Sequence, residues 1–305
     1  MLLVLALGAG ISLSAAAQQV ADTSYNPPIH APSFEPGQGP RVAIDAAHLN
    51  FHTADGRYSA FASLLRRDGY EVVSNTEVFT AVALADIDIL VIANPLHEQS
   101  KFGWAALPNL SAFTEAEIEA VEQWVREGGA LMLIADHMPI AGHAEALAAA
   151  FGVRFQNGFA YEAGGSGTTT FRRSDGTLPP NSISNGRHAE ARIDSVTTFT
   201  GQAFRVDPDV VAQPLLVFPE GSVLFLPEKA WEFSESTPRI PAAYLLQGAT
   251  LAHGQGRVAV FGEAAMFSAQ LAGPEKRRMG MNNEAAGQNY RFALNVLQWL
   301  SDPLR

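Results

Sequence analysis

The chain has 305 residues, of which 47% are hydrophobic and 17% charged, and it contains no cysteine. This length and apolar fraction are typical of a folded protein with a sizeable core and exclude a disordered chain. The missing cysteine excludes a disulfide scaffold, zinc–thiolate and iron–sulfur sites, and a cysteine nucleophile. The 31 acidic and 20 basic residues give a net charge of −11, which argues against nucleic acid or an anionic membrane as the main partner.

The amino terminus resembles a secretory signal peptide. Residues 2–17 are apolar and uncharged and end in a run of small residues before Gln18, although no basic segment precedes them. A buried helix of the mature fold is the alternative, but a proline-rich stretch separates this segment from the first expected strand. We expect a signal peptide at residues 1–17, a linker at 18–40, and a soluble protein that is periplasmic or secreted in a bacterium.

From residue 41 onward the sequence alternates short apolar strands with amphipathic helices. Strands are expected at residues 41–45, 70–73, 87–93, 130–135 and 257–261, and helices at 58–67, 114–127, 144–150 and 289–300. This alternation predicts an α/β fold whose parallel sheet has helices on both faces. Residues 157–250 contain short β-type runs between Gly, Pro and Asn turns, which predicts a β-rich insertion within a single domain of residues 41–305.

Polar side chains follow four of the expected strands, at the edge where open parallel sheets bind ligands. In chain order they are Asp45, His48, Asn50 and His52, then Asn94 and His97, then Asp136, His137 and His143, and finally Glu263. Any one of them taken alone is typical of a cap or a solvated turn. Histidine after three of the four strands favours a shared site.

One interpretation of this cluster is a divalent metal site, with zinc or manganese as the expected ion. His48, His52, His137 and Asp136 would be the ligands, because imidazoles and carboxylates suit these ions and an open position would activate water. Glu263 would act as general base or as a further ligand. The His48–His52 spacing alone is weak evidence, since no glutamate lies between the two as in metalloprotease helices.

Two other interpretations remain open. In a metal-free site, Asp45 or Asp136 would orient a histidine that acts as general base. In a binding site without turnover, the same loops would hold a ligand by hydrogen bonds. In either case Asn50, Asn94, His97 and His143 are expected to contact a small-molecule substrate.

Other sequence motifs provide weaker evidence for a function. The Gly-rich run at 164–167 matches neither phosphate-binding nor dinucleotide-binding patterns, and the G-x-S-x-G nucleophile motif is absent. Several aromatic residues could line a pocket with affinity for carbohydrate or aromatic groups, or could form the core of the insertion: Trp104, Phe159, Tyr161, Phe171, Trp231 and Phe233.

The segments IDAAHLNFH, DILVIANPL, ALMLIADHMPIAG and GRVAVFGEAAMFSAQ resemble a bacterial branch of the class I glutamine-amidotransferase-like superfamily. Relatives in this superfamily include trehalose-utilisation-like proteins and non-catalytic domains of gliding-motility and intraflagellar-transport proteins. The resemblance implies a flavodoxin-like sheet. Amidotransferases carry a cysteine after the strand that corresponds to residues 130–135, where this chain has Asp136 and His137, so glutaminase chemistry is excluded. Trehalose-utilisation-like relatives have a histidine near this turn, which matches His137.

These observations lead to the expectation of an exported, metal-dependent hydrolase that acts on an ester, lactone or amide bond of a small molecule. One alternative is a non-catalytic protein that binds a sugar or another small polar ligand. Another is an interaction domain whose ancestor lost its catalytic cysteine.

Overall fold

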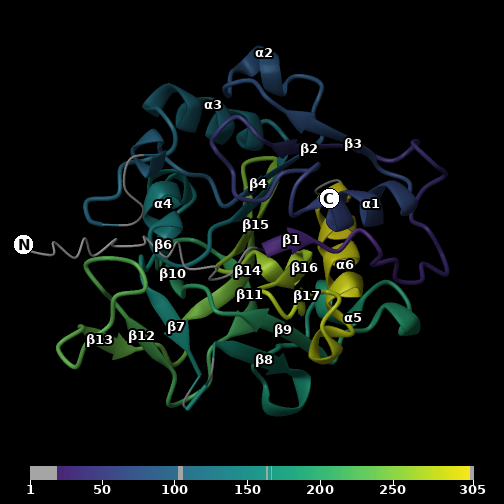
Figure 1. Cartoon of the computed structure of the whole chain (residues 1–305). Coiled ribbons are helices and arrows are strands. Elements are labelled where there is room, and N and C mark those ends of the chain that lie inside the picture. Colours follow the sequence, from purple (N-terminus) through teal and green to yellow (C-terminus); the bar gives the residue numbers. More distant parts are fainter. Residues whose placement is uncertain (1–18, 102–105, 163, 166, 303–305) are drawn as a thin grey trace, which may run out of the picture.

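A computed structural model describes residues 19–101, 106–162, 164–165 and 167–302 of the chain (Figure 1). The expected signal peptide at residues 1–17 and the aromatic residue Trp104 lie outside these ranges. Within them, no helix combines the length and the apolar character that crossing a bilayer requires.

A nine-stranded sheet forms the centre of the molecule. Its strands run in the order β3-β2-β4-β5-β15-β14-β10-β6, and β11 also pairs with β14. The bounds are β2 (Arg41–Asp45), β3 (Glu71–Asn75), β4 (Ile89–Ala93), β5 (Ala130–Ile134), β6 (Val153–Phe155), β10 (Phe204–Val206), β11 (Ala212–Val217), β14 (Leu246–His253) and β15 (Gly256–Phe261). The strands β3, β2, β4, β5 and β15 are parallel, whereas every pairing beyond β15 is antiparallel.

The predicted α/β class is confirmed, but the prediction of a parallel sheet is wrong for the half that contains β14, β10, β6 and β11. A two-residue turn at Gly254 and Gln255 joins β14 to β15, so these two strands must be antiparallel. Gly254 has a φ of +60°, which such a turn favours. Three strands of the expected insertion at 157–250, namely β10, β11 and β14, therefore extend the main sheet.

Helices cover both faces of the sheet, and each face has its own apolar core (Figure 1). The helices α1 (Ser59–Arg67) and α6 (Asn289–Ser301) pack on the face that contains Ile44 and Met132. On the opposite face, α2 (Ala81–Leu84), α3 (Glu115–Arg126) and α4 (Ile140–Ala150) pack on Leu90 and Leu133. The parallel strands are buried on both faces, which explains their nearly continuous apolar sequence.

Three small sheets surround this core. One joins β1 (Gln19–Ala21), β16 (Ala269–Ala272) and β17 (Arg277–Gly280), another joins β7 (Phe159–Tyr161), β12 (Val223–Phe225) and β13 (Arg239–Pro241), and β8 (Thr168–Arg172) pairs with β9 (Ser195–Phe199). Residues 19–21, expected in a linker, thus form a strand of the fold. The remaining helical segments are α5 (Ser182–Asn185), η1 (Glu98–Lys101), η2 (Arg173–Asp175), η3 (Ala189–Ala191), η4 (Ala265–Phe267) and η5 (Glu284–Ala286).

Candidate functional site

The carboxyl ends of β2, β4, β5 and β15 lie next to one another, because these four strands are adjacent and parallel. Asp45 ends β2, Asn94 follows β4, and Glu263 comes two residues after β15. These three side chains and Asp136, which follows β5, are all buried. The sequence-based prediction that polar residues gather at this edge is therefore consistent with the strand order.

His48 is held between two carboxylates. Its Nδ1 lies 2.9 Å from Oδ2 of Asp45, and its Nε2 lies 2.9 Å from Oε1 of Glu117 at the start of α3. The rings of Phe79 and Phe113 lie 4.6 and 4.7 Å from the imidazole, centroid to centroid. Burial alone would lower the pKa of His48, but hydrogen bonds to the two carboxylates and their charges raise it above its usual value. A protonated imidazole that donates from both nitrogens fits this arrangement.

The side-chain amide of Asn94 fixes the orientation of its neighbours. Its Oδ1 accepts a hydrogen bond from the main-chain N–H of Asp136 at 3.0 Å, so its Nδ2 is the donor. This Nδ2 lies 3.2 Å from Oδ2 of Asp136 and 3.2 Å from Nδ1 of His52. Asn94 has a φ of +52°, a left-handed conformation that asparagine adopts more readily than most residues. The turn after β4 thus connects the loops that follow β2 and β5.

The contact with Asn94 determines the tautomer of His52. Because Asn94 donates to Nδ1, that nitrogen carries the lone pair, and a neutral ring then has its proton on Nε2. Burial and the positive charge of Arg57 lower the pKa of His52 to about 3, so the ring is neutral near pH 7. Its Nε2 is buried and has no hydrogen-bond partner among the described residues. His52 therefore presents an unused N–H donor.

Arg57 supplies a second unused donor near this ring. Its Nη1 is buried without a hydrogen-bond partner in the described part of the chain, and its guanidinium carbon lies 3.8 Å from the centroid of the Phe51 ring. Burial lowers the pKa of Arg57, while the negative charge of Asp136 opposes that shift. Arginine keeps its charge at neutral pH. A cation thus faces Asp136 without forming a direct ion pair with it.

Asp136 and His137 lie on the turn after β5. The carboxylate of Asp136 accepts the N–H of His137 at 3.3 Å as well as the amide of Asn94. Nδ1 of His137 lies 2.7 Å from the carbonyl oxygen of Met138, so it is a donor and the lone pair of the neutral ring is on Nε2. The imidazole stacks on Phe159 at 4.5 Å and meets the edge of Trp231 at 4.7 Å. We call Asn94, Asp136, His137, His52 and Arg57 the strand-end site.

Glu263 lies beside this site as a buried cap. Its two carboxyl oxygens accept the main-chain N–H groups of Ala265 at 2.7 Å and Met266 at 2.8 Å, at the start of η4. Burial and the nearby charge of Asp136 raise its pKa well above the usual value. Glu263 is 0% exposed, and burial of this kind disfavours the charged form of a carboxyl group. The role of Glu263 as general base or further ligand stays a prediction from the sequence.

The four residues expected to ligate a metal do not come together as a ligand set. Both ring nitrogens of His48 are already within hydrogen-bond distance of carboxylates. Across the described ranges, no group of three or more His, Cys, Asp or Glu side chains is placed to hold an ion. The expected zinc or manganese site remains a prediction from the sequence, without a donor set in the described residues that supports it.

The residues expected to bind substrate are distributed more widely. Asn50 accepts the N–H of His48 at 3.1 Å and thus shapes the loop after β2. Nδ1 of His143 lies 2.6 Å from the carbonyl oxygen of Leu110, and its ring stacks on His97 at 6.4 Å. Only Asn94 of the four belongs to the strand-end site. Its contacts orient both His52 and Asp136.

Three residues of this region have no role in the sequence-based site. Glu117 is part of the capping box that Thr114 begins, and its contact with His48 joins positions 69 residues apart. Arg57 belongs to no sequence motif that indicates a functional site. In the sequence, Tyr58 is only an aromatic residue at the start of an expected helix. In the structure, its hydroxyl donates to the carbonyl oxygen of Ala264 at 2.9 Å. Proximity to the other strand ends, which depends on the fold, is what identifies them.

No family model matches the chain, and no curated protein matches it. Among solved structures, the mmIFT52 N-terminal domain has a TM-score of 0.55 at 15% identity, with 85% of this chain and 96% of that one covered. A ThuA-like protein from Bacteroides uniformis has a TM-score of 0.46 at 11% identity, covering 90% and 94%. A GMP synthase subunit from Thermoplasma acidophilum has a TM-score of 0.39 at 10% identity, covering 87% and 98%. The chain is thus similar in fold to the mmIFT52 N-terminal domain.

Proposed function

We propose that the strand-end site hydrolyses a small molecule that carries an ester, lactone or amide carbonyl, with Asp136 as general base. The observation that supports this proposal is the Asn94 amide, whose nitrogen lies 3.2 Å from both His52 Nδ1 and Asp136 Oδ2. The shared contact sets a neutral N–H donor beside a carboxylate. Carbonyl hydrolysis uses both, because the attacking water must lose a proton and the carbonyl oxygen gains negative charge.

The proposed reaction assigns one step to each group. Asp136 takes a proton from water while the water oxygen forms a bond to the carbonyl carbon. The π electrons move to the carbonyl oxygen, where His52 Nε2–H and the Arg57 guanidinium stabilise the oxyanion. When the intermediate collapses, the bond from carbon to the leaving oxygen or nitrogen breaks. The leaving group then takes the proton from Asp136, which restores the carboxylate.

Binding without turnover is the second candidate, and the two unpartnered donors also fit it. His52 and Arg57 could hold a carbonyl, carboxylate or hydroxyl oxygen of a sugar or another polar ligand. Because the charge of Arg57 is buried, a partly anionic oxygen is favoured at this position. In this case the site would bind a substrate-like molecule and leave it unchanged.

One experiment separates these possibilities. Purified protein without its leader is screened against ester, lactone and amide substrates with and without a chelator, beside Asp136→Asn and elemental analysis for metals. Turnover that survives the chelator and disappears in Asp136→Asn supports the metal-free hydrolase. Turnover that requires a stoichiometric ion supports the metal site expected from the sequence. Thermal stabilisation by a ligand without turnover supports binding alone.

We also propose export to the periplasm or the medium, on the basis of the apolar residues 2–17. Cell fractionation with mass spectrometry of the mature amino terminus tests it. Cleavage after Ala17 supports export, and an intact amino terminus in the cytoplasmic fraction contradicts it.

A further inference from the structure

The small sheet formed by β13, β12 and β7 lies at the periphery of the molecule, and its two faces differ in their surroundings (Figure 1). Strand alternation places Ala160 of β7 and its register partner Leu224 of β12 on one face. Both are buried in the apolar core that also contains Ile44. The register pairs on either side of them therefore point to the opposite face, away from this core.

Four side chains share this opposite face: Tyr161 with Val223, and Phe159 with Phe225. Phe159 is fully buried, and the ring of Phe233 lies 5.1 Å from it, centroid to centroid. The other three are only partly buried and, together with Phe233, border a cavity of about 420 Å³. This volume is within the range of cavities that bind small molecules. We call it the sheet-face cavity.

Three aromatic rings form walls of the sheet-face cavity, and the ring of Phe225 stands at nearly right angles to the other two. It lies at 74° to the ring of Tyr161 and at 80° to the ring of Phe233, with centroids 5.8 and 5.9 Å apart. The face of an aromatic ring carries partial negative charge. Several rings around one cavity therefore favour a cationic ligand.

Glu162 adds a full negative charge to the same wall. It is partly buried, and its carboxylate forms no ion pair or hydrogen bond with a described residue. No Lys, Arg or His is among the described residues that border the cavity. Arg239, which lies opposite Phe225 in the small sheet, is exposed and is not part of this wall. The wall as described thus carries one negative and no positive charge.

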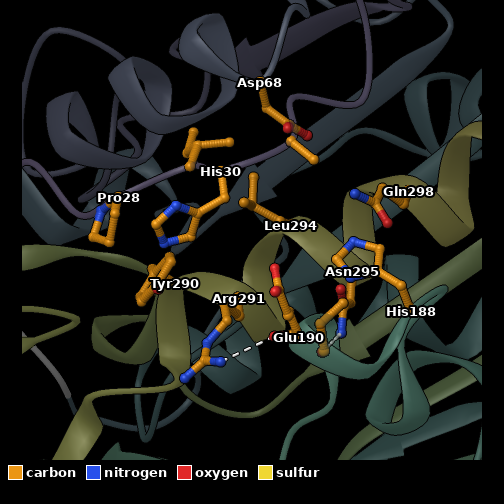
Figure 2. Close-up of a pocket in the computed structure, with 13 residues that line it drawn as sticks. Pro28, His30, Asp68, His188, Glu190, Tyr290, Arg291, Leu294, Asn295 and Gln298 are labelled. Carbon is orange, nitrogen blue, oxygen red and sulfur yellow. Dashed lines mark hydrogen bonds between the residues drawn. The ribbon is translucent and has the colours of Figure 1, made fainter.

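The cavity against α6 that Figure 2 shows has a different wall. It includes Arg291 together with His30 and His188, and Nε of Arg291 is a buried donor without a partner among the described residues. A guanidinium in the wall disfavours a second cation. Of these two cavities, only the sheet-face cavity is bordered by described residues without a basic side chain.

We infer that the sheet-face cavity binds a small quaternary ammonium ion, whose methyl groups pack on the three rings while its charge lies near Glu162. A quaternary ammonium group has no N–H to donate, which fits a wall of ring faces with one carboxylate. The net charge of −11 also favours the approach of cations over anions. None of the wall residues belongs to the strand-end site, so this inference is independent of the proposed hydrolase activity.

Calorimetric titration at low ionic strength tests the inference with choline and two compounds of similar shape. In 3,3-dimethylbutan-1-ol a carbon atom replaces the charged nitrogen, and 3,3-dimethylbutyrate carries a negative charge instead. We expect choline to bind about tenfold more tightly than the neutral alcohol, as contacts between a cation and several ring faces imply. Butyrate binding should be the weakest of the three.

Two substitutions assign this preference to the wall. Phe233→Leu removes one ring but keeps an apolar side chain, so it should weaken choline binding by roughly threefold and change that of the alcohol little. Glu162→Gln should weaken choline binding selectively as well. The matched controls are Tyr244→Leu and Glu235→Gln, at exposed positions outside the cavity. Phe233 is 43% exposed, and thermal unfolding checks that each variant is folded.

Absence of choline binding, or equal binding of choline and the alcohol, would overturn the inference. A preference for 3,3-dimethylbutyrate would overturn it too and would point to Arg239. So would a preference for choline that survives both wall substitutions, or one that Glu235→Gln reduces as much as Glu162→Gln does. The same titration with Asp136→Asn should give the wild-type result, so failure of the proposed hydrolase and failure of this cation site are observed separately.

Discussion

Nε2 of His48 and Oε1 of Glu117 lie 2.9 Å apart and tie the loop after β2 to the first turn of α3. Glu117 also accepts the main-chain N–H of Thr114 and that of Phe79. One carboxylate therefore caps a helix and holds a histidine from another element. Through Asp45, the same histidine is anchored to the end of β2. The position of the loop that carries His52 therefore depends on the buried contacts among Asp45, His48 and Glu117, which we call the charge network.

Replacing His48 with Phe tests how much the charge network contributes to stability. The new ring fits between Phe79 and Phe113 in size, but Asp45 and Glu117 each lose a charged donor. Both carboxylates are buried, with side chains 0% and 9% exposed, so water does not replace the lost contact. We expect a loss of about 3 kcal/mol in the free energy of unfolding, measured by chemical denaturation. The same substitution at the exposed His188 should change little, and an equal effect at both positions would contradict this account.

Protonation of the His48 imidazole should make the free energy of unfolding depend on pH. The raised pKa of His48 means that its contribution is complete below the ordinary value of 6.5 and is lost as the pH rises through the folded value. For Glu117, burial would raise the pKa, but hydrogen bonds from Thr114 and His48 lower it below 4.5, so its contribution is lost only as the pH falls through that lowered value.

We therefore expect the difference in unfolding free energy between wild type and His48→Phe to be largest between pH 4.5 and 6.5. It should shrink as the solution becomes alkaline. Denaturation series at several pH values measure it, and a difference that does not change with pH would show that His48 is not protonated in the fold.

The main elements of the fold could be predicted from the sequence because each is encoded locally. The strand Arg41–Asp45 has the predicted bounds, and the capping box at Thr114 and Glu117 marks the start of α3. The direction of β14 could not be predicted, since its sequence mixes Gln247, Gly248 and Thr250 with apolar residues and no helix lies between it and β15 to indicate a crossover. The sequence predicts the start of α4 at residue 144, four residues after its observed start at Ile140, because Pro139 and Gly142 are poor helix signals.

The residues of the candidate site can be predicted from the sequence, but the chemical role of each residue cannot. Strand order indicates that Asp45, Asn94 and Asp136 reach one edge, and the structure brings them there. Whether a histidine is a metal ligand or a salt-bridge partner depends on what lies at its second nitrogen. For His48 that partner is Glu117, a contact between distant segments that no local pattern encodes.

Asp136→Asn and His52→Gln test the proposed hydrolysis on the substrate found by the screen. We expect Asp136→Asn to lower kcat by at least about a hundredfold through loss of the general base. His52→Gln should lower kcat by about a hundredfold with a smaller effect on KM, since its N–H acts mainly on the oxyanion. Steady-state kinetics measure both, and His30→Gln, at an exposed position outside the site, is the control. Unchanged kcat in Asp136→Asn would remove Asp136 from the mechanism.

Glu263 should carry a proton at neutral pH. Burial is the main cause of its raised pKa, and Asp136 adds to the shift. Infrared difference spectra should show the carbonyl stretch of a protonated carboxylic acid at pH 7, and Glu263→Gln should remove that band. Asp136→Asn should keep it, because burial is the larger of the two causes. If the band disappears in Asp136→Asn but not in Glu263→Gln, the proton belongs to Asp136, which would contradict its role as a base.

The double role of Glu117 predicts an energetic coupling between two residues that do not touch. Thr114→Ala removes the hydroxyl that caps α3 and should cost about 1 kcal/mol. In the His48→Phe background the same substitution should cost less, since the carboxylate of Glu117 is no longer held by the imidazole and caps the helix in a less fixed position. A double-mutant cycle measures this coupling, which we expect to exceed about 0.5 kcal/mol. Thr80→Ala, which removes the cap of α2, is the matched control and should be additive with His48→Phe. Additivity at Thr114 as well would show that the cap of α3 and the charge network are independent.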